Sequence, residues 1–299
     1  MKHALPKILI TGASGFTGQH ACTHFLQAGF EVIAVARSHF HADQIQIESC
    51  DLTEKEAVRK LIHKTKPHYV LHLAGQNHVG QSWDDPISTM ESNALSTLFL
   101  LEAVRREAPS AKVVVVGSAL EFDTTNIATL THPYSLSKTI QSIIAQAWQR
   151  LYDMDIVIAK PTNLIGPGVS TGVCSVFAKK IAGMELGVAP TVLKVNNLQA
   201  QRDFLDVRDA IRAYESLLRM GRAGEIYPVY SGENRSLEEI IFAFKKLTSI
   251  EFKVQAKVVN QQEHPEEVIS EALMQLGWRP LIPLEVTLQE ILEYCRNSN

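Results

Sequence analysis

Short apolar runs alternate with longer helix-like segments through the first half of the chain. The runs are rich in β-branched and aliphatic residues, as is typical of strands that are buried within a sheet. Because helical segments separate them, the strands are expected to be parallel and joined by right-handed crossovers. The pattern predicts an α/β fold with a parallel sheet, and it places strands at residues 7–10, 31–36, 44–49, 69–73, 112–117 and 155–160.

Two of the helical segments, residues 93–107 and 134–152, carry wide apolar faces. Burial against the sheet is one explanation of such a face. A helix that is apolar nearly all round also needs a second cover, which another copy of the chain would supply. We therefore expect a homodimer formed through these two helices.

The first strand leads directly into a glycine-rich turn, Thr11-Gly12-Ala13-Ser14-Gly15-Phe16-Thr17-Gly18. Gly12 permits the tight reversal from strand to helix, Gly15 lets main-chain N–H groups approach a pyrophosphate, and Gly18 lets the helix pack closely on the strand. The N-terminus of the helix adds unpaired donors and a positive dipole end. Strand, turn and helix together predict a Rossmann-type, doubly wound dinucleotide-binding domain.

The regular alternation of strand-like and helix-like segments ends after Pro161. Gly166-Pro167-Gly168 and Gly172 mark a loop there, and shorter elements follow it. We expect a dinucleotide-binding domain over residues 1–161, to which the chain returns at about 201–230. The remainder of 162–299 is expected to form a smaller, mixed α/β substrate-binding lobe.

Composition narrows the range of partners. A net charge of -3 over 299 residues lacks the signature of polyanion binding, so we expect a small-molecule partner and neither nucleic acid nor membrane. No apolar run approaches the roughly 18 residues of a membrane span, and the N-terminus does not resemble a signal peptide, which predicts a cytoplasmic protein. The scattered cysteines and histidines predict free thiols and no metal site.

The residues after the second strand bear on the choice of coenzyme. An acidic side chain there would accept hydrogen bonds from the ribose hydroxyls of NAD, whereas an arginine accommodates the extra phosphate of NADP. This chain has Arg37 and Ser38 and no acid, so NADP(H) is preferred and NAD(H) stays possible. Asp51 could reach the adenine, or it could cap a helix that starts near Thr53.

Tyr134 and Lys138 form the second strong signal, because residues four apart lie on one face of a helix. A phenol with a pKa near 10 is a poor acid–base group at neutral pH, and an adjacent ammonium group is expected to lower that value by two to three units. Ser118 follows a predicted strand and so lies at the carboxyl end of the sheet, where its hydroxyl could donate to the same substrate oxygen.

In this order the motifs resemble the extended short-chain dehydrogenase/reductase family of NAD-dependent epimerases and dehydratases. The family pattern of TGxxGxxG, a serine or threonine, and YxxxK is met by Gly12, Gly15, Gly18, Ser118, Tyr134 and Lys138. The match continues over nearly the whole chain. It is strongest to the GDP-4-keto-6-deoxy-D-mannose reductases and their dehydratase relatives, on the stretches 76–83, 163–168, 202–209 and 277–280.

The resemblance implies reduction of the C4 ketone of a nucleotide-linked 4-keto-6-deoxy sugar, with hydride from NADPH and a proton from Tyr134. It implies a catalytic group of Ser118, Tyr134 and Lys138, the last also holding the nicotinamide ribose. The implied coenzyme contacts are Gly12, Ser14, Gly15, Phe16, Gly18, Arg37, Ser38, Asp51, Leu52, Leu73, Ala74, Gly75, Asn93, Tyr134, Lys138 and Pro161. The implied substrate contacts are Ser118, Asn163, Val173, Lys179, Arg202 and Glu267.

The sequence also departs from the family pattern. Dehydratases need a glutamate two positions beyond the catalytic serine or threonine, where this chain has Leu120, and Glu121 is one residue late. An apolar side chain cannot take a sugar proton, so dehydration is disfavoured. His264 stands where the family has an arginine, and Asn196 where it has a glycine. These changes leave open which nucleotide base and which sugar the substrate carries.

Two other functions are compatible with the same motifs. A nucleotide-sugar 4-epimerase would use tightly bound NAD, against which Ala36 and Arg37 speak. A non-catalytic dinucleotide-binding regulator would have no need of the serine, tyrosine and lysine together.

Overall fold

The computed structural model describes residues 5–37, 44–257 and 268–298. The chain forms two compact units. Unit 1 consists of Met1–Pro161, Ile211–Val229 and Ala272–Trp278, and unit 2 of Thr162–Ala210, Tyr230–Glu271 and Arg279–Asn299. The chain therefore enters unit 1 again twice after leaving it.

Unit 1 is built on a parallel sheet, which has seven strands in the described residues, in the order β10-β6-β5-β4-β1-β2-β3. The order reverses between β1 and β4, and ligands of doubly wound folds bind at such a switch point, outside the carboxyl ends of the strands. This confirms the predicted fold class. The strands are β1 (Lys7–Thr11), β2 (Glu31–Ala36), β3 (Gln46–Ser49), β4 (Tyr69–His72), β5 (Lys112–Val116), β6 (Ile156–Pro161) and β10 (Ile226–Val229).

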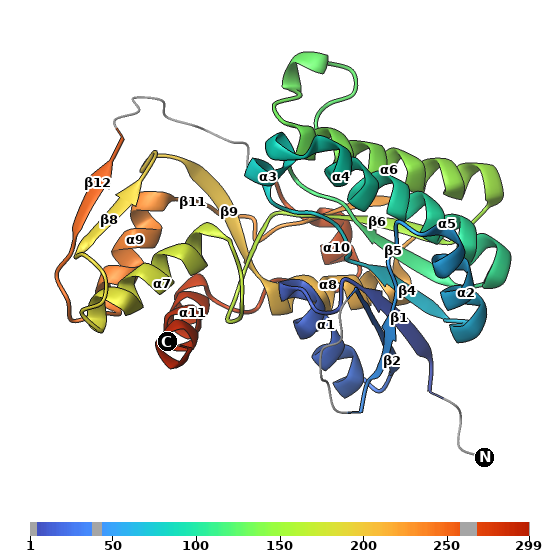
Figure 1. Ribbon diagram of the computed structural model, residues 1–299, viewed down its shortest axis with the longest axis horizontal. Coiled ribbons are helices and arrows are strands. Elements are labelled where there is room, and N and C mark those ends of the chain that lie inside the picture. Colours follow the sequence, from blue (N-terminus) through green and yellow to red (C-terminus); the bar gives the residue numbers. More distant parts are fainter. Residues whose placement is uncertain (1–4, 38–43, 258–267, 299) are drawn as a thin grey trace. The chain divides into compact units, whose positions relative to one another are not determined.

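Helices cover both faces of this sheet (Figure 1). On one face lie α2 (Lys55–Thr65), α5 (Ser96–Glu107) and α6 (Pro133–Tyr152), and on the other lies α1 (Phe16–Gln27). Unit 1 also contains α3 (Val79–Asp84), α4 (Pro86–Met90), a π-helical segment (Glu91–Leu95), a 3₁₀ segment (Ile127–Thr129), most of α8 (Val207–Met220) and most of α10 (Glu271–Gln275).

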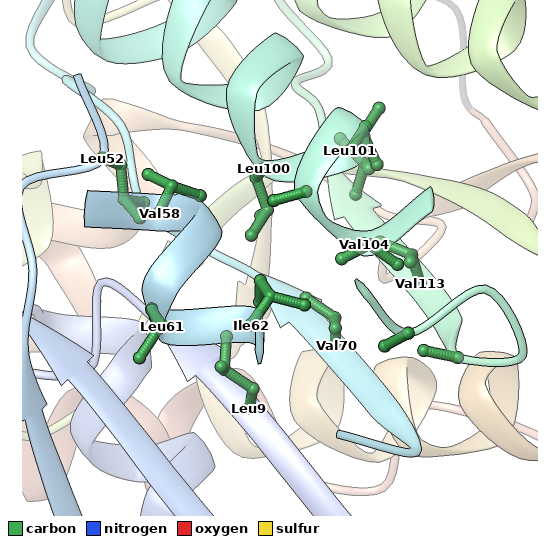
Figure 2. Packing of buried hydrophobic residues seen from close by; sticks show 14 of the residues in the cluster. Leu9, Leu52, Val58, Leu61, Ile62, Val70, Leu100, Leu101, Val104 and Val113 are labelled. Carbon is green, nitrogen blue, oxygen red and sulfur yellow. The ribbon is translucent and has the colours of Figure 1, made fainter. Parts of the chain in front are cut away.

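A large apolar cluster of unit 1 lies between the sheet and the helices α2 and α5. Figure 2 shows aliphatic side chains of both helices gathered over Leu9 of β1 and Val70 of β4, which are fully buried. Each such side chain contributes about 1.5–3 kcal/mol by leaving water. This packing holds the carboxyl ends of β1, β4 and β5 in fixed register, which positions the loops that follow them.

Unit 2 is smaller and mixes parallel and antiparallel pairs. In the part that the structure describes, β9 (Gln201–Asp206) pairs with β7 (Asn163–Ile165) in parallel and with β11 (Asn234–Ser236) in antiparallel fashion. A second pair joins β8 (Val192–Val195) to β12 (Lys253–Ala256). The helices α7 (Val173–Glu185), α9 (Leu237–Lys246) and α11 (Leu284–Asn297) share one apolar core with these strands.

The predicted elements differ from the observed ones mainly at their ends. The helix expected over 93–107 begins as a π-helical turn at Glu91, and the side chain of Asn93 in that turn binds the main chain of Gln76. Single π-helical turns within α-helices are frequently found at functional sites. Separately, none of the described helices is long and apolar enough to cross a membrane.

Candidate active site

The turn between β1 and α1 is closely packed around its glycines. Gly12 has φ 68°, and a Cβ there would lie 2.9 Å from the Ala74 main chain. A Cβ on Gly18 would lie 2.1 Å from the Gly12 carbonyl oxygen. Gly15 is the N-cap of α1, and in the described residues no side chain caps it. The first N–H groups of α1 are thus available to an anion, which fits the pyrophosphate of a dinucleotide.

The other residues expected to contact the coenzyme on this side vary in exposure. Ser14 is exposed, and Phe16 is half-buried with its ring edge-on to His20. Arg37 is exposed after β2, while Ser38 lies outside the described residues. Leu52 is buried in the core between α2 and the sheet, so its side chain serves packing.

Asp51 forms a local turn. Its carboxylate accepts hydrogen bonds from Thr53 N (2.9 Å) and Thr53 Oγ1 (2.8 Å). These bonds hold its pKa below the usual value, with a smaller contribution from Arg37. The alternative that Asp51 caps a helix near Thr53 is wrong, because α2 begins at Lys55 and its N-cap is Glu54.

The loop after β4 lies against the glycine turn. The main-chain N–H groups of Leu73 and Ala74 both donate to Thr11 Oγ1, each at 3.1 Å. Gly75 leaves room for Asn93, whose Oδ1 would lie 2.6 Å from a Cβ at that position. The amide of Asn93 is engaged with the Gln76 main chain and with Ser137 Oγ, so in this structure it positions the loop.

Ser118 and Tyr134 are brought together at the carboxyl end of the sheet. Ser118 follows β5, and Tyr134 lies in the first turn of α6. Both residues are buried, with 7% of their surface exposed. Ser118 Oγ accepts a hydrogen bond from Leu120 N (3.1 Å), so its proton is free to point elsewhere. The hydroxyl of Ser118 acts on that of Tyr134 and lowers its pKa, so the two groups lie close together. Pro161, the last residue of β6, accepts from Ala119 N and holds this segment in place.

The phenol of Tyr134 is less acidic than the sequence indicated. Burial raises the pKa of Tyr134 above the usual value, the Ser118 hydroxyl opposes this, and the Glu121 carboxylate adds to it. The expected lowering of the Tyr134 pKa by Lys138 is therefore wrong. The reason is visible in the lysine, whose ammonium group donates to Val116 O (2.7 Å) and Gln141 Oε1 (2.5 Å).

Lys138 continues into a buried polar chain that the sequence did not predict. Gln141 Nε2 donates to Thr97 Oγ1 (3.0 Å), which lies 2.8 Å from His72 Nε2. His72 Nδ1 lies 2.8 Å from Thr11 Oγ1. Since Thr11 Oγ1 already accepts two N–H groups, its proton points to Nδ1 and Nε2 carries the imidazole proton. Burial, with the charge of Lys138, lowers the pKa of His72 to about 3, so the ring is neutral.

The residues expected to bind substrate in unit 2 are placed as follows. Asn163 and Arg202 lie on neighbouring strands, and Asn163 Nδ2 donates to Asp203 O (3.0 Å). Val173 opens α7 and packs against the core of unit 2, and Lys179 is exposed near Cys295. Glu267 and His264 lie outside the described residues.

The sheet, the glycine turn and the serine–tyrosine pair define a dinucleotide-binding α/β protein with a candidate acid–base group at the ends of its strands. A sequence model of the NAD dependent epimerase/dehydratase family matches residues 8–230. The chain belongs to this family, which confirms the resemblance to extended short-chain dehydrogenases/reductases.

Individual relatives are similar over almost their whole length. The GDP-6-deoxy-D-mannose reductase of Pseudomonas aeruginosa is 28% identical, covering 96% of each chain. The dTDP-D-glucose 4,6-dehydratase of Homo sapiens is 25% identical, covering 98% of this chain and 90% of that one. Among solved structures, RMD from Pseudomonas aeruginosa complexed with NADPH is 27% identical with a TM-score of 0.85, covering 98% of this chain and 100% of that one.

Proposed function

We propose that this protein reduces the C4 ketone of a nucleotide-linked 4-keto-6-deoxy sugar with NADPH, in the manner of a GDP-4-keto-6-deoxy-mannose reductase. The observation that carries the proposal is the buried Ser118–Tyr134 pair, held in the same unit as the glycine turn. The similarity to the GDP-6-deoxy-D-mannose reductase of Pseudomonas aeruginosa supports the choice of substrate class. The similarity to the NADPH complex of RMD from the same organism supports the choice of coenzyme.

The chemistry of the pair favours reduction. A ketone that accepts hydride needs a proton donor for its oxygen, and bound NADPH supplies the hydride. Tyr134 is suited to donate because burial keeps the phenol protonated at neutral pH. Ser118, with its oxygen occupied by Leu120 N, has a proton for the same substrate oxygen. Lys138 would hold the nicotinamide ribose.

Other features speak against the alternatives. An epimerase would use tightly bound NAD, whose ribose is bound by an acidic side chain after the second strand, where this chain has the exposed Arg37. A dehydratase needs a free carboxylate beyond the serine. Leu120 occupies that place, and the Glu121 carboxylate is engaged with Ser118 N and Lys160.

In this proposal the coenzyme occupies the glycine turn of unit 1. The loop after β4 lines the site, and Arg37, with Ser38, favours NADP(H) over NAD(H) by its permanent charge. Unit 2 supplies the nucleotide-sugar contacts, for which we propose Asn163, Val173, Lys179, Arg202 and Glu267.

The test begins with a thermal-shift screen of GDP, UDP, dTDP and CDP sugars in the presence of NADPH, because a true ligand stabilises the folded state. Turnover of the matching 4-keto-6-deoxy sugar is then followed by loss of NADPH absorbance. Tyr134→Phe should keep NADPH binding and lose roughly 10²- to 10⁴-fold in turnover. Equal loss of both would reject the assigned role. Sugar interconversion with retained NAD would show an epimerase, and tight NADPH binding without turnover a regulator.

We also propose that the protein is a homodimer formed through the outer faces of α5 and α6. Ile143 and Leu151 of α6 and Leu95, next to α5, are exposed by 47%, 68% and 40%. Sedimentation equilibrium should give twice the chain mass, and Ile143→Asp with Leu151→Asp should give the monomer. A monomeric wild-type protein would reject this assembly.

A further inference from the structure

A buried carboxylate, that of Glu121, binds the main chain of Ser118. Glu121 Oε1 accepts hydrogen bonds from Ser118 N (3.1 Å) and Ser142 Oγ (2.8 Å), and Oε2 pairs with Lys160 Nζ at 2.7 Å. The Glu121 side chain is only 6% exposed and that of Lys160 28%. Burying a carboxylate is costly unless it is paired, and here three contacts, from the segment after β5, from α6 and from β6, satisfy both of its oxygens.

The surrounding chain is shaped to receive this carboxylate. A Cβ at Gly117 would lie 2.4 Å from Glu121 Oε1, so the glycine leaves the space that the oxygen fills. On α6, Ser142 lies four residues beyond Lys138 and eight beyond Tyr134, and all three therefore share one face of the helix. Glu121 thus ties the end of β5 to the helix face that carries the proton donor.

Resting on the function proposed above, we propose that Glu121 is a positioning residue for the Ser118–Tyr134 pair. It fixes the backbone at Ser118, and it supplies to the surroundings of the phenol a negative charge that is paired with Lys160. Both oxygens of the Glu121 carboxylate are engaged, so neither is free to take a proton from a sugar. Its role in this proposal is to adjust the acidity of the Tyr134 hydroxyl.

The charges around the phenol allow this tuning to be read out. Lys138 faces the region from α6, Lys160 from β6, and the neutral His72 from β4. His132 caps α6 next to Tyr134, while on α3 the contacting residue is the uncharged Ser82.

The Glu121 carboxylate raises the pKa values of both Tyr134 and Lys138. Because this side chain is hardly exposed, water screens its charge only weakly.

The experiment titrates Tyr134 directly, by NMR of protein labelled with ¹³C at the tyrosine ring carbon that bears the hydroxyl, and assigns its signal with Tyr134→Phe. Glu121→Gln should lower the pKa of Tyr134, because a neutral amide no longer opposes formation of the phenolate. Lys160→Gln, which leaves the carboxylate unbalanced, should raise it. The double variant should titrate near the wild type, and Glu102→Gln on α5, whose carboxylate pairs with Arg105 and Arg106, serves as the matched control without a shift.

Opposite shifts from the two partners cannot arise from general damage to the fold. An unchanged Tyr134 titration in both single variants, or shifts of the same sign, would overturn the proposal. If Glu121→Gln alone does not fold, Lys160→Gln and the double variant still decide the sign.

The titration uses no substrate, so its failure concerns Glu121 alone, whereas absent turnover in the wild type concerns the proposed function. Where turnover is found, Glu121→Gln should lose it at lower pH than the wild type. The sign follows because the protonated phenol is the donor, and activity falls as the pH rises through its pKa.

Discussion

Lys138 donates a hydrogen bond from its ammonium group to the side-chain oxygen of Gln141, one turn further along α6. A second bond to Val116 O completes its surroundings, and burial lowers the pKa of Lys138 to about 8, against a smaller opposing contribution from Glu121. The pKa of Lys138 therefore lies in the mildly alkaline range.

This pKa has a consequence for stability. Between about pH 8 and 10 the unfolded chain binds a proton at this lysine that the folded protein does not, so stability should rise with pH. The rise amounts to at most about 3 kcal/mol. Urea unfolding of the wild type and of Lys138→Met across this pH range isolates the contribution of Lys138. The pH dependence that comes from all other groups is the same in both proteins and cancels in the difference. A wild-type curve parallel to that of Lys138→Met would contradict the assignment, and Lys55→Met, at an exposed position, is the control.

His72 should control stability on the acid side. The folded ring stays neutral down to about pH 3, whereas the unfolded ring binds a proton below about pH 6.5, so this contribution is lost as the pH falls between these values. His72→Leu should flatten that acid limb in urea unfolding. At neutral pH it should cost about 1–3 kcal/mol, because Thr11 and Thr97 lose a buried partner. An unaltered acid limb would show that the ring is protonated in the folded state.

Gly18→Ala should disrupt the glycine turn. The added methyl group would lie 2.1 Å from the Gly12 carbonyl oxygen, which forces α1 away from β1. We expect a loss of about 1–3 kcal/mol in unfolding free energy and a marked loss of NADPH affinity by fluorescence titration. Gly172→Ala, where the nearest atom is Ser170 Oγ at 3.3 Å, is the control in unit 2. Full NADPH affinity in Gly18→Ala would place the coenzyme elsewhere.

Arg37→Ala should change the choice of coenzyme. The side chain is exposed at the end of β2, and its permanent charge would pair with the extra phosphate of NADPH. The ratio of NADPH to NADH affinity should fall by roughly tenfold, the equivalent of one charge-assisted hydrogen bond. NADH affinity itself is the internal control and should stay the same. An unchanged ratio would remove Arg37 from the coenzyme site.

Much of unit 1 could be predicted from the sequence because its signals are local. The strands β1, β2 and β5 are nearly continuous apolar runs, and the glycines between β1 and α1 stand at fixed spacing. Tyr134 and Lys138 were found because helical periodicity places residues four apart on one face. The start of α2 at Lys55 was missed because the local turn of Asp51 and Thr53 precedes the helix.

By itself, the sequence determined the order of elements, the phosphate-binding turn, and which serine, tyrosine and lysine form the candidate acid–base group. Only the tertiary structure decided what those groups touch: Lys138 turns to Gln141, Glu121 binds the main chain of Ser118, and His72 joins two threonines inside the unit. The physical reason is that patterns within a segment depend on near neighbours, whereas burial and proton affinity depend on side chains that packing brings together from distant segments. For the same reason the phenol became a weaker acid than its spacing from Lys138 indicated.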